Sequence, residues 1–164
     1  MADESRFEQI VVDIIAALSA ITAGADYHYK PDAVVPVEKY SKAHLDTSKG
    51  IIYFVRDSGD ETALIDQDEF GREAKECEVF VLACYLDQRS TTNPFDQPTP
   101  LRRTIRNRMV RDIEKKLAED YRRSDLAVNT QLTDVRRAIA DAPEAWVVAE
   151  LAFRIIFVHD PDSP

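Results

Sequence analysis

The feature that most constrains the fold is an apolar stretch near the C-terminus, residues 144–158. In a β-strand, neighbouring side chains point to opposite faces of the sheet. One face of this stretch is entirely apolar and consists of Ala145, Val147, Ala149, Leu151, Phe153, Ile155 and Phe157. The other face is mixed, because Glu150 and Arg154 interrupt its apolar residues. β-branched and aromatic residues favour a strand over a helix. We therefore expect a long central strand with one buried face and one face that meets water, a channel or another polar surface.

Three other segments are expected to be extended. Residues 51–55 and 76–86 are apolar runs typical of buried strands. Residues 25–37 contain Pro31 and Pro36. Because proline is tolerated at a sheet edge and not in a central strand, this segment is expected to be an edge strand or an irregular crossing.

The first predicted helix covers residues 5–23. Ser5 and Glu8 match a capping box, and Gly24 stands where a helix C-cap is expected. The apolar residues between them recur at helical spacing, which predicts a helix with one face packed on the sheet.

The second predicted helix runs from near Thr99, with Pro100 at the first helical position, to about Tyr121. It follows a long polar loop at residues 87–100. Residues 124–143 are expected to be a polar connection that holds a short helical turn around 133–140.

At 164 residues and 18.6 kDa, the chain can form a core without disulfides or a structural metal. We predict one domain over residues 1–164, with 159–164 as an extended tail. Cys77 and Cys84 are seven positions apart on one expected strand, hence on opposite faces and roughly 23 Å apart. A disulfide needs Cα atoms within about 7 Å, so two buried free thiols in a reducing compartment are expected.

Composition argues against membrane insertion and secretion. No apolar run approaches the roughly 20 residues that cross a bilayer. The N-terminus is acidic, whereas a signal peptide begins with a basic region. We expect the protein to work in the compartment where it is made.

Charge is unevenly distributed along the chain. The net charge is −9, but residues 102–123 hold nine basic and four acidic residues, a net charge of +5. Residues 57–69 hold six acids and no base. Their spacing does not match a calcium-binding loop, so a solvated loop or a docking surface for a basic partner is expected. A basic helix on an acidic body is the most informative electrostatic feature.

Motifs of catalysis and cofactor binding are absent from the sequence. There is no glycine-rich phosphate loop, no Gly-x-Ser-x-Gly, no His-Glu-x-x-His and no Cys-x-x-Cys. The histidines, His28, His44 and His159, are dispersed. We predict no catalytic residue, no cofactor and no metal site, and we do not expect an enzyme.

The order of expected elements, together with several short motifs, resembles the tail terminator (tail completion) proteins of long-tailed bacteriophages. The residues that carry the resemblance are Leu18, Ile21, Gly24, Tyr27, Tyr29, Pro31, Val35, Ile52, Tyr53, Val55, Phe157, His159, Asp160 and Pro164. It extends over nearly the whole chain and rests on a pattern of elements and small motifs.

This resemblance implies an α/β (α+β) fold, with two principal helices packed on one face of a mainly antiparallel sheet. It also implies a structural virion protein, assembled in the host cytoplasm, that forms a homohexameric ring at the head–tail junction. Such a ring caps the tail tube and joins the tail to the head connector or stopper protein. Genomic DNA passes through the lumen without specific binding.

The resemblance combined with the charge pattern suggests which residues meet a neighbour. A ring needs contacts between two different patches of each subunit. We expect these patches to be the basic residues Arg102, Arg103 and Arg106 and the acidic residues Asp57, Asp60, Glu61 and Asp66. Glu150 and Arg154 are expected to face the lumen.

Two alternatives share the absence of catalytic motifs. Another neck component, such as a head-completion or stopper protein, would differ in the partner that it binds. A nucleic-acid-binding module would use the helix at residues 102–123, and its affinity for DNA would fall steeply as salt rises.

Overall fold

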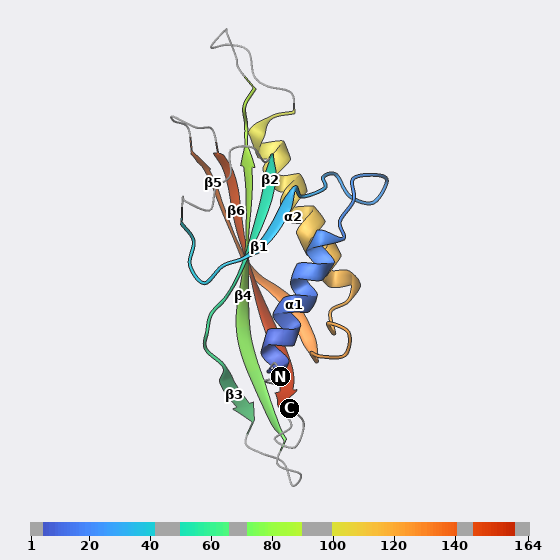
Figure 1. Cartoon of the computed structure of the whole chain (residues 1–164), viewed down its shortest axis with the longest axis vertical. Coiled ribbons are helices and arrows are strands. Elements are labelled where there is room, and N and C mark those ends of the chain that lie inside the picture. The colour runs from blue at the N-terminus through green and yellow to red at the C-terminus, as the bar shows by residue number, and fades with distance from the viewer. Residues whose placement is uncertain (1–4, 42–49, 66–71, 90–99, 141–145, 160–164) are drawn as a thin grey trace.

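A computed structural model describes residues 5–41, 50–65, 72–89, 100–140 and 146–159. The elements follow one another in chain order (Figure 1). They are α1 (Arg6–Ser19), β1 (Ala33–Pro36), β2 (Ile51–Asp57), β3 (Thr62–Ile65), β4 (Glu73–Leu86), α2 (Arg102–Glu119), β5 (Asn129–Ala140) and β6 (Trp146–His159). The strands form one sheet in the order β1-β2-β4-β6-β5, and β3 also pairs with β4. Only β1 and β2 are parallel among the described pairs, so the predicted mainly antiparallel α+β fold is confirmed.

β6 is the long central strand that the C-terminal stretch predicted. It lies between β4 and β5, and its pairing with β4 runs without a break from Trp146 opposite Leu86 to His159 opposite Glu73. The apolar row on its odd positions is buried from Val147 to Phe157. Ala145 of the predicted row lies outside the described residues.

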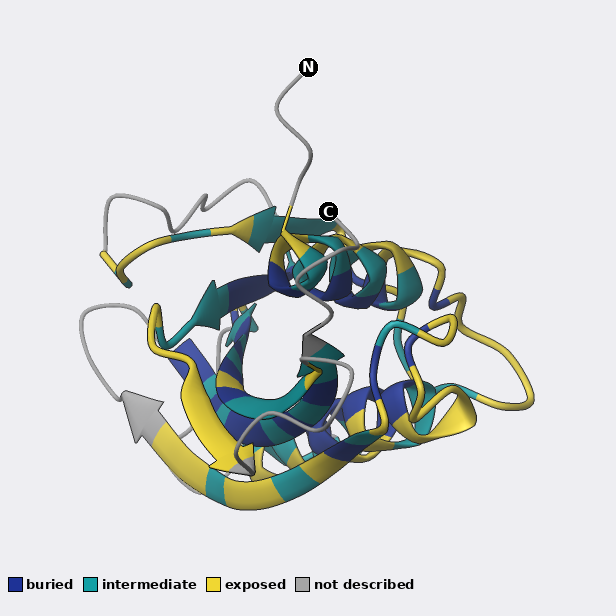
Figure 2. Ribbon diagram, turned by 90° about the horizontal axis from the view of Figure 1, so that it is seen from below, coloured by how far each residue is buried: buried dark blue, intermediate teal, exposed yellow. Residues whose placement is uncertain are grey.

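Both helices pack on the face of the sheet that carries this row. Their buried residues share one core with the odd positions of β6, and in Figure 2 the helices turn their buried sides inward. The fully buried side chains of the two helices are Ile10, Ile14, Leu18, Met109, Ile113 and Leu117. Burial of each such side chain contributes roughly 1.5–3 kcal/mol. The core therefore accounts for the position of the helices, as the sequence predicted.

The start of α1 confirms the predicted capping box. The Ser5 hydroxyl accepts the backbone N–H of Glu8, and the Glu8 carboxylate accepts the backbone N–H of Ser5. α1 ends at Ser19 rather than at residue 23. The last turn tightens there, because the backbone N–H of Ile21 donates to the carbonyl of Leu18 three residues back.

The opposite face of the sheet holds a smaller apolar cluster at one end. Its buried members are Ile52, Phe54, Cys84, Leu86 and Trp146, and Val37 and Tyr40 pack against them. The chain crosses this face after β1 (Figure 1). Cys77 belongs to the helix-side core and Cys84 to this cluster, so the prediction of two free thiols buried on opposite faces is confirmed.

Three further predictions about local structure were wrong. Residues 129–140 form strand β5 rather than a polar connection with a helical turn. The pattern was hidden because β5 is a largely exposed edge strand and a bulge between Leu132 and Asp134 breaks its alternation. α2 begins at Arg102, after an N-cap at Leu101 that makes no side-chain hydrogen bond, so neither Thr99 nor Pro100 starts it.

The third wrong prediction concerns the acidic run at residues 57–69, which is not entirely a loop. Asp57 ends β2, and Thr62–Ile65 form β3. Both strands pair antiparallel with β4, and the backbone N–H of Ser58 donates to the carbonyl of Glu78 between them. β2 and β3 therefore act as one interrupted strand along β4.

Candidate interaction surfaces

The basic charge of α2 and the following turn divides into two halves. In the C-terminal half the cations have intramolecular partners. Lys115 pairs with Asp26 at 3.1 Å and Lys116 with Glu119 at 2.8 Å. Both ammonium groups also lie over the ring of Tyr27, which donates a short hydrogen bond to Glu119. This half is largely neutralised within the chain.

Four arginines within the first ten residues of α2 keep their positive charge. Within the described part of the chain, Arg103, Arg106, Arg108 and Arg111 make no salt bridge. The first turn has no acidic residue. Because a helix N-terminus carries a partial positive charge, Arg103 in the first turn adds to it, and the other three arginines extend the positive charge along the helix. We call these four residues the arginine patch.

Arg102 is not part of this patch, because it binds a buried carboxylate. Its Nε lies 2.9 Å from Asp87 Oδ2, and Arg89 Nε lies 2.7 Å from Asp87 Oδ1. The Asp87 side chain is fully buried. Burial by itself would raise the pKa of Asp87, but the hydrogen bonds from Arg89 and Arg102 outweigh it and lower that pKa to about 2. Arg89 also donates to the carbonyl of Pro100, so this cluster ties the end of β4 to the start of α2.

The predicted acidic residues lie around the β2–β3 junction. Asp60 is exposed, and Asp57 is half-buried at the end of β2. Glu61 pairs with Lys75 at 3.0 Å, so part of its charge is compensated. Asp66 lies outside the described residues. We call the surface formed by residues 57–64 the acidic edge.

Glu150 and Arg154 lie on the face of the sheet opposite α1 and α2, as the alternation of β6 predicted. We call this the helix-free face. Both side chains are half-buried. Arg154 forms a close ion pair with Glu76 of the neighbouring strand β4. Glu150 stands in register between Leu82 and Arg136. This face therefore presents charges of both signs rather than a uniformly acidic surface.

Arg56 occupies an aromatic setting on the same face. Its guanidinium carbon lies 4.4 Å from the centroid of the Phe80 ring and 5.2 Å from that of Tyr40. Burial is the main cause that raises the pKa of Tyr40 to about 12, with a contribution from Glu150. The contact between Arg56 and Tyr40 holds the segment that follows β1 against this face of the sheet.

Two buried ionic contacts were missed from the sequence. Asp112 lies on the buried side of α2 and binds the segment that contains His28. Arg123 is fully buried after α2, and its guanidinium donates to the carbonyl of Leu117 and lies 3.5 Å from Asp13. Burial lowers the pKa of Arg123. The sequence signal for the first contact is a charged residue, Asp112, within the apolar stripe of α2. Nothing in the local pattern around Arg123 predicts its burial.

A groove also lies beside Arg123, between the start of α1, the turn after α2 and the end of β6. Its volume is about 350 Å³, and it is lined by Arg6, Tyr121, Arg122, Asp125, Leu126, Ala127, Val128 and Val158. The turn that shapes it has three consecutive residues with positive φ, namely Arg123 (48°), Ser124 (55°) and Asp125 (67°). We call this feature the turn groove.

The described residues contain no group of three or more metal-ligating side chains. Among the described helices, none is long and apolar enough to cross a membrane. Neither a protein-family model nor a curated protein sequence matches this chain.

Proposed function

We propose that this protein is a structural virion component that caps the tail tube of a long-tailed bacteriophage. In this proposal it forms a homohexameric ring at the neck and joins the tail to the head connector or stopper protein. The observation that carries the proposal is the one-sided architecture. Both helices cover one face of the sheet, and the other face carries polar and charged side chains such as Glu150 and Arg154. A subunit of this design can turn its sheet toward a water-filled lumen and its helices outward.

The charge on the helix-free face suits a lumen through which DNA passes. Arg154 is paired with Glu76, and Arg136 is paired with Asp134 at 3.0 Å. Because these cations already have carboxylate partners, they attract phosphate less strongly than free cations do. DNA would therefore slide past this face without being held.

The arginine patch is the proposed contact for another neck or tail component. It lies along the first ten residues of α2, and the start of α2 lies toward one end of the long axis of the molecule (Figure 1). In a ring whose axis follows that direction, the patch would lie near one rim, where an acidic surface of the next component would stack. Complementary charge of this kind speeds association and selects the partner.

The test is the mass of the purified protein in solution, by light scattering at low and moderate salt, alone and with candidate tail-tube protein. A discrete ring, or a monomer that becomes a ring on the tube, supports the proposal. A monomer that ignores tube protein contradicts it. Pull-down against tube protein and against portal protein separates a terminator from another neck component.

A second candidate function, nucleic-acid binding, is favoured by the arginine patch. Four arginines that have no carboxylate partner among the described residues could contact phosphates. In that case the DNA affinity of the wild type would fall steeply with salt, and Arg103→Glu together with Arg111→Glu would reduce the slope of log affinity against log salt by roughly 2. DNA binding without assembly would favour this function over the ring.

A further inference from the structure

We infer that the acidic edge of one subunit docks against the turn groove of a second copy of the same chain. The inference rests on the proposed ring and specifies its lateral contact. It assigns an occupant to a groove for which the sequence suggested no role.

The turn groove combines apolar contact area with a small net positive charge. Tyr121 and Val128 line it with 52% and 53% of their surface exposed. Arg6, Arg122 and Asp125 stand in the same lining; Arg122 pairs with Asp125 at 3.0 Å, so two arginines and one aspartate leave a net charge of +1. Exposed aromatic and aliphatic side chains beside arginines are typical of the buried centre of protein–protein contacts. The groove therefore fits a partner that offers carboxylates beside an apolar side chain.

The groove is held in a fixed shape before any partner binds. Asp120 accepts the backbone N–H groups of Arg122 and Ser124, at 3.2 and 2.7 Å. Arg6 donates to the carbonyls of Asp125 and Leu126, at 2.9 and 2.8 Å. A surface that is already ordered loses little conformational entropy on binding.

The acidic edge has the matching chemistry. Asp57 and Asp60 supply carboxylates, Glu61 adds one that already pairs with Lys75, and Leu64 keeps 39% of its surface exposed on β3. The sequence contains no basic residue between positions 57 and 69. Carboxylates and an exposed leucine on one short segment match the chemistry of the turn groove.

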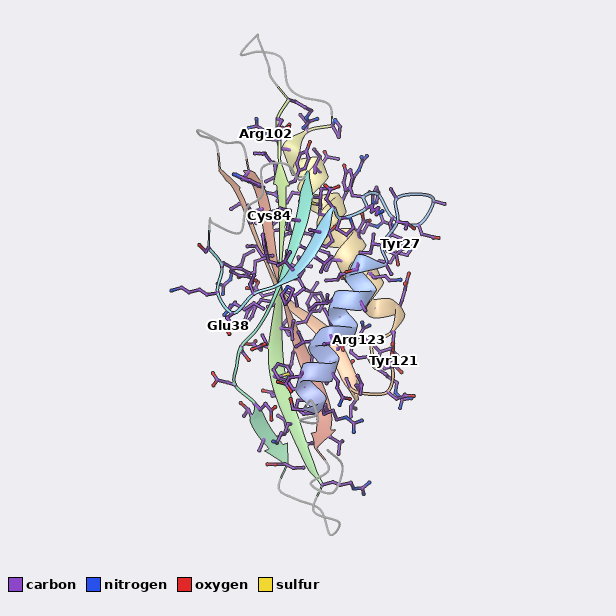
Figure 3. All side chains as sticks on the ribbon, in the orientation of Figure 1. Tyr27, Glu38, Cys84, Arg102, Tyr121 and Arg123 are labelled. Atoms are coloured by element: carbon purple, nitrogen blue, oxygen red, sulfur yellow. The ribbon has the colours of Figure 1, made fainter. Side chains whose placement is uncertain are left out.

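The placement of the two surfaces makes the contact intermolecular. β3 lies on the left of the lower half of the molecule in Figure 1, and Tyr121 lies on the right in the same orientation in Figure 3. Two different patches on opposite sides of a subunit give a head-to-tail contact, which closes into a ring when the rotation between copies permits it.

The same figures favour the turn groove over the start of α2 as the site for the acidic edge. Arg102 is near the upper end of the long axis in Figure 3, whereas β3 is in the lower half. If the acidic edge of one copy bound the start of α2 of its neighbour, each copy would be displaced along the long axis relative to the copy before it. Repetition of that shift gives a helical stack, whereas the turn groove permits neighbours at one level.

Engineered cross-linking tests the contact directly. The double variant Leu64→Cys/Tyr121→Cys, under mild oxidation, is expected to give a covalent ladder up to the ring size, because a disulfide forms only when Cα atoms come within about 7 Å. Neither single variant should give a ladder. The matched control is Leu64→Cys/Val12→Cys, because Val12 is as exposed as Tyr121, at 55%, and lies outside the groove lining.

The outcomes separate this inference from the proposed function. A ring by light scattering with no ladder from Leu64→Cys/Tyr121→Cys overturns the docking inference and leaves the ring standing. A ladder from Leu64→Cys/Arg103→Cys instead would assign the acidic edge to the start of α2. A monomer without any ladder, alone and with tube protein, overturns both.

Charge reversal provides a second measurement. Arg122→Glu and Asp60→Lys are each expected to raise the concentration at which the ring dissociates by about tenfold or more at low salt, through like-charge repulsion. The combined variant should restore assembly, because it exchanges the two signs. Failure of the combination to recover assembly, with both single variants weakened and folded, contradicts a direct contact between these residues.

Discussion

His28 is held by Asp112, a buried carboxylate on α2. Asp112 Oδ1 lies 2.8 Å from His28 Nδ1, and Asp112 Oδ2 accepts the backbone N–H groups of His28 and Tyr29, each at 2.9 Å. One carboxylate therefore satisfies two backbone donors and an imidazole nitrogen. This contact fixes the segment between α1 and β1 on α2.

Replacement of this carboxylate should destabilise the fold. Asp112→Ala is expected to lower the free energy of unfolding by roughly 2–5 kcal/mol, because two backbone N–H groups lose their acceptor. Asp112→Asn should cost less, since its amide oxygen can still accept them. Urea unfolding gives both values. The control is Asp26→Ala, which removes an exposed partner of Lys115 and should change stability by no more than about 1 kcal/mol. Equal losses for the Asp112 and Asp26 alanine variants would contradict this role.

The cluster around Asp87 predicts a pH dependence of stability. Its folded-state pKa is lowered to about 2 by Arg89 and Arg102 against the opposing effect of burial. A lowered pKa stabilises the fold above the unfolded-state pKa of about 3.9, and this contribution disappears as pH falls toward 2. The expected contribution near neutral pH is roughly 2 kcal/mol.

The measurement compares wild type with Asp87→Asn by chemical unfolding between pH 7 and pH 2.5. The difference in unfolding free energy should be largest above about pH 5 and shrink as the carboxyl group is protonated. Asp134→Asn, which breaks an exposed pair with Arg136, should show a difference of no more than about 1 kcal/mol at any pH. A difference for Asp87→Asn that is constant across the range would rule out ionisation as the cause.

Much of the fold could be predicted because the buried elements carry their own periodicity. The row from Val147 to Phe157 and the stripe of α1 are buried as predicted. β5 was missed because an edge strand buries little, and the exposed Asp134, Arg136 and Arg137 give it no apolar alternation. Hydrophobic periodicity reports burial, and it does not detect a strand that is held mainly by backbone pairing with one neighbour.

The candidate surfaces were less predictable, because charge in a sequence does not reveal its partners. The +5 segment predicts one basic surface, yet Arg102 and Arg123 are bound by carboxylates within the fold. The turn groove joins residues from α1, the turn after α2 and β6, and sequence spacing cannot show that Arg6 and Val158 line the same groove.

The two cysteines should be unreactive in the folded protein. Burial raises the pKa of both thiols to about 12, with nearby carboxylates adding to the effect at Cys77. At pH 8 only about one thiol in 10⁴ would then be ionised, and the thiolate is the reactive form. A chromogenic disulfide reagent should detect no fast-reacting thiol in the native protein and two per chain in denaturant. Rapid labelling of either thiol under native conditions would contradict this burial.

The left-handed turn after α2 should show measurable backbone strain. Asp125 has a φ of 67°, a region that costs a residue with a Cβ atom about 1–2 kcal/mol and costs glycine little. We expect Asp125→Gly to be more stable than Asp125→Ala by about 1 kcal/mol, because both lose the ion pair with Arg122 and only glycine relieves the strain.

Thermal and urea unfolding compare the stability of Asp125→Gly with that of Asp125→Ala. Position 118 is the control, because glycine should there be less stable than alanine. Ala118 is exposed in the last turn of α2, so Ala118→Gly should lower stability by roughly 0.5 kcal/mol through helix propensity, less than the cost in a helix interior. If glycine and alanine at position 125 were equally stable, the turn would be unstrained. The fixed shape of the turn groove would then rest on the hydrogen bonds of Asp120 and Arg6 alone, and loss of either should loosen it.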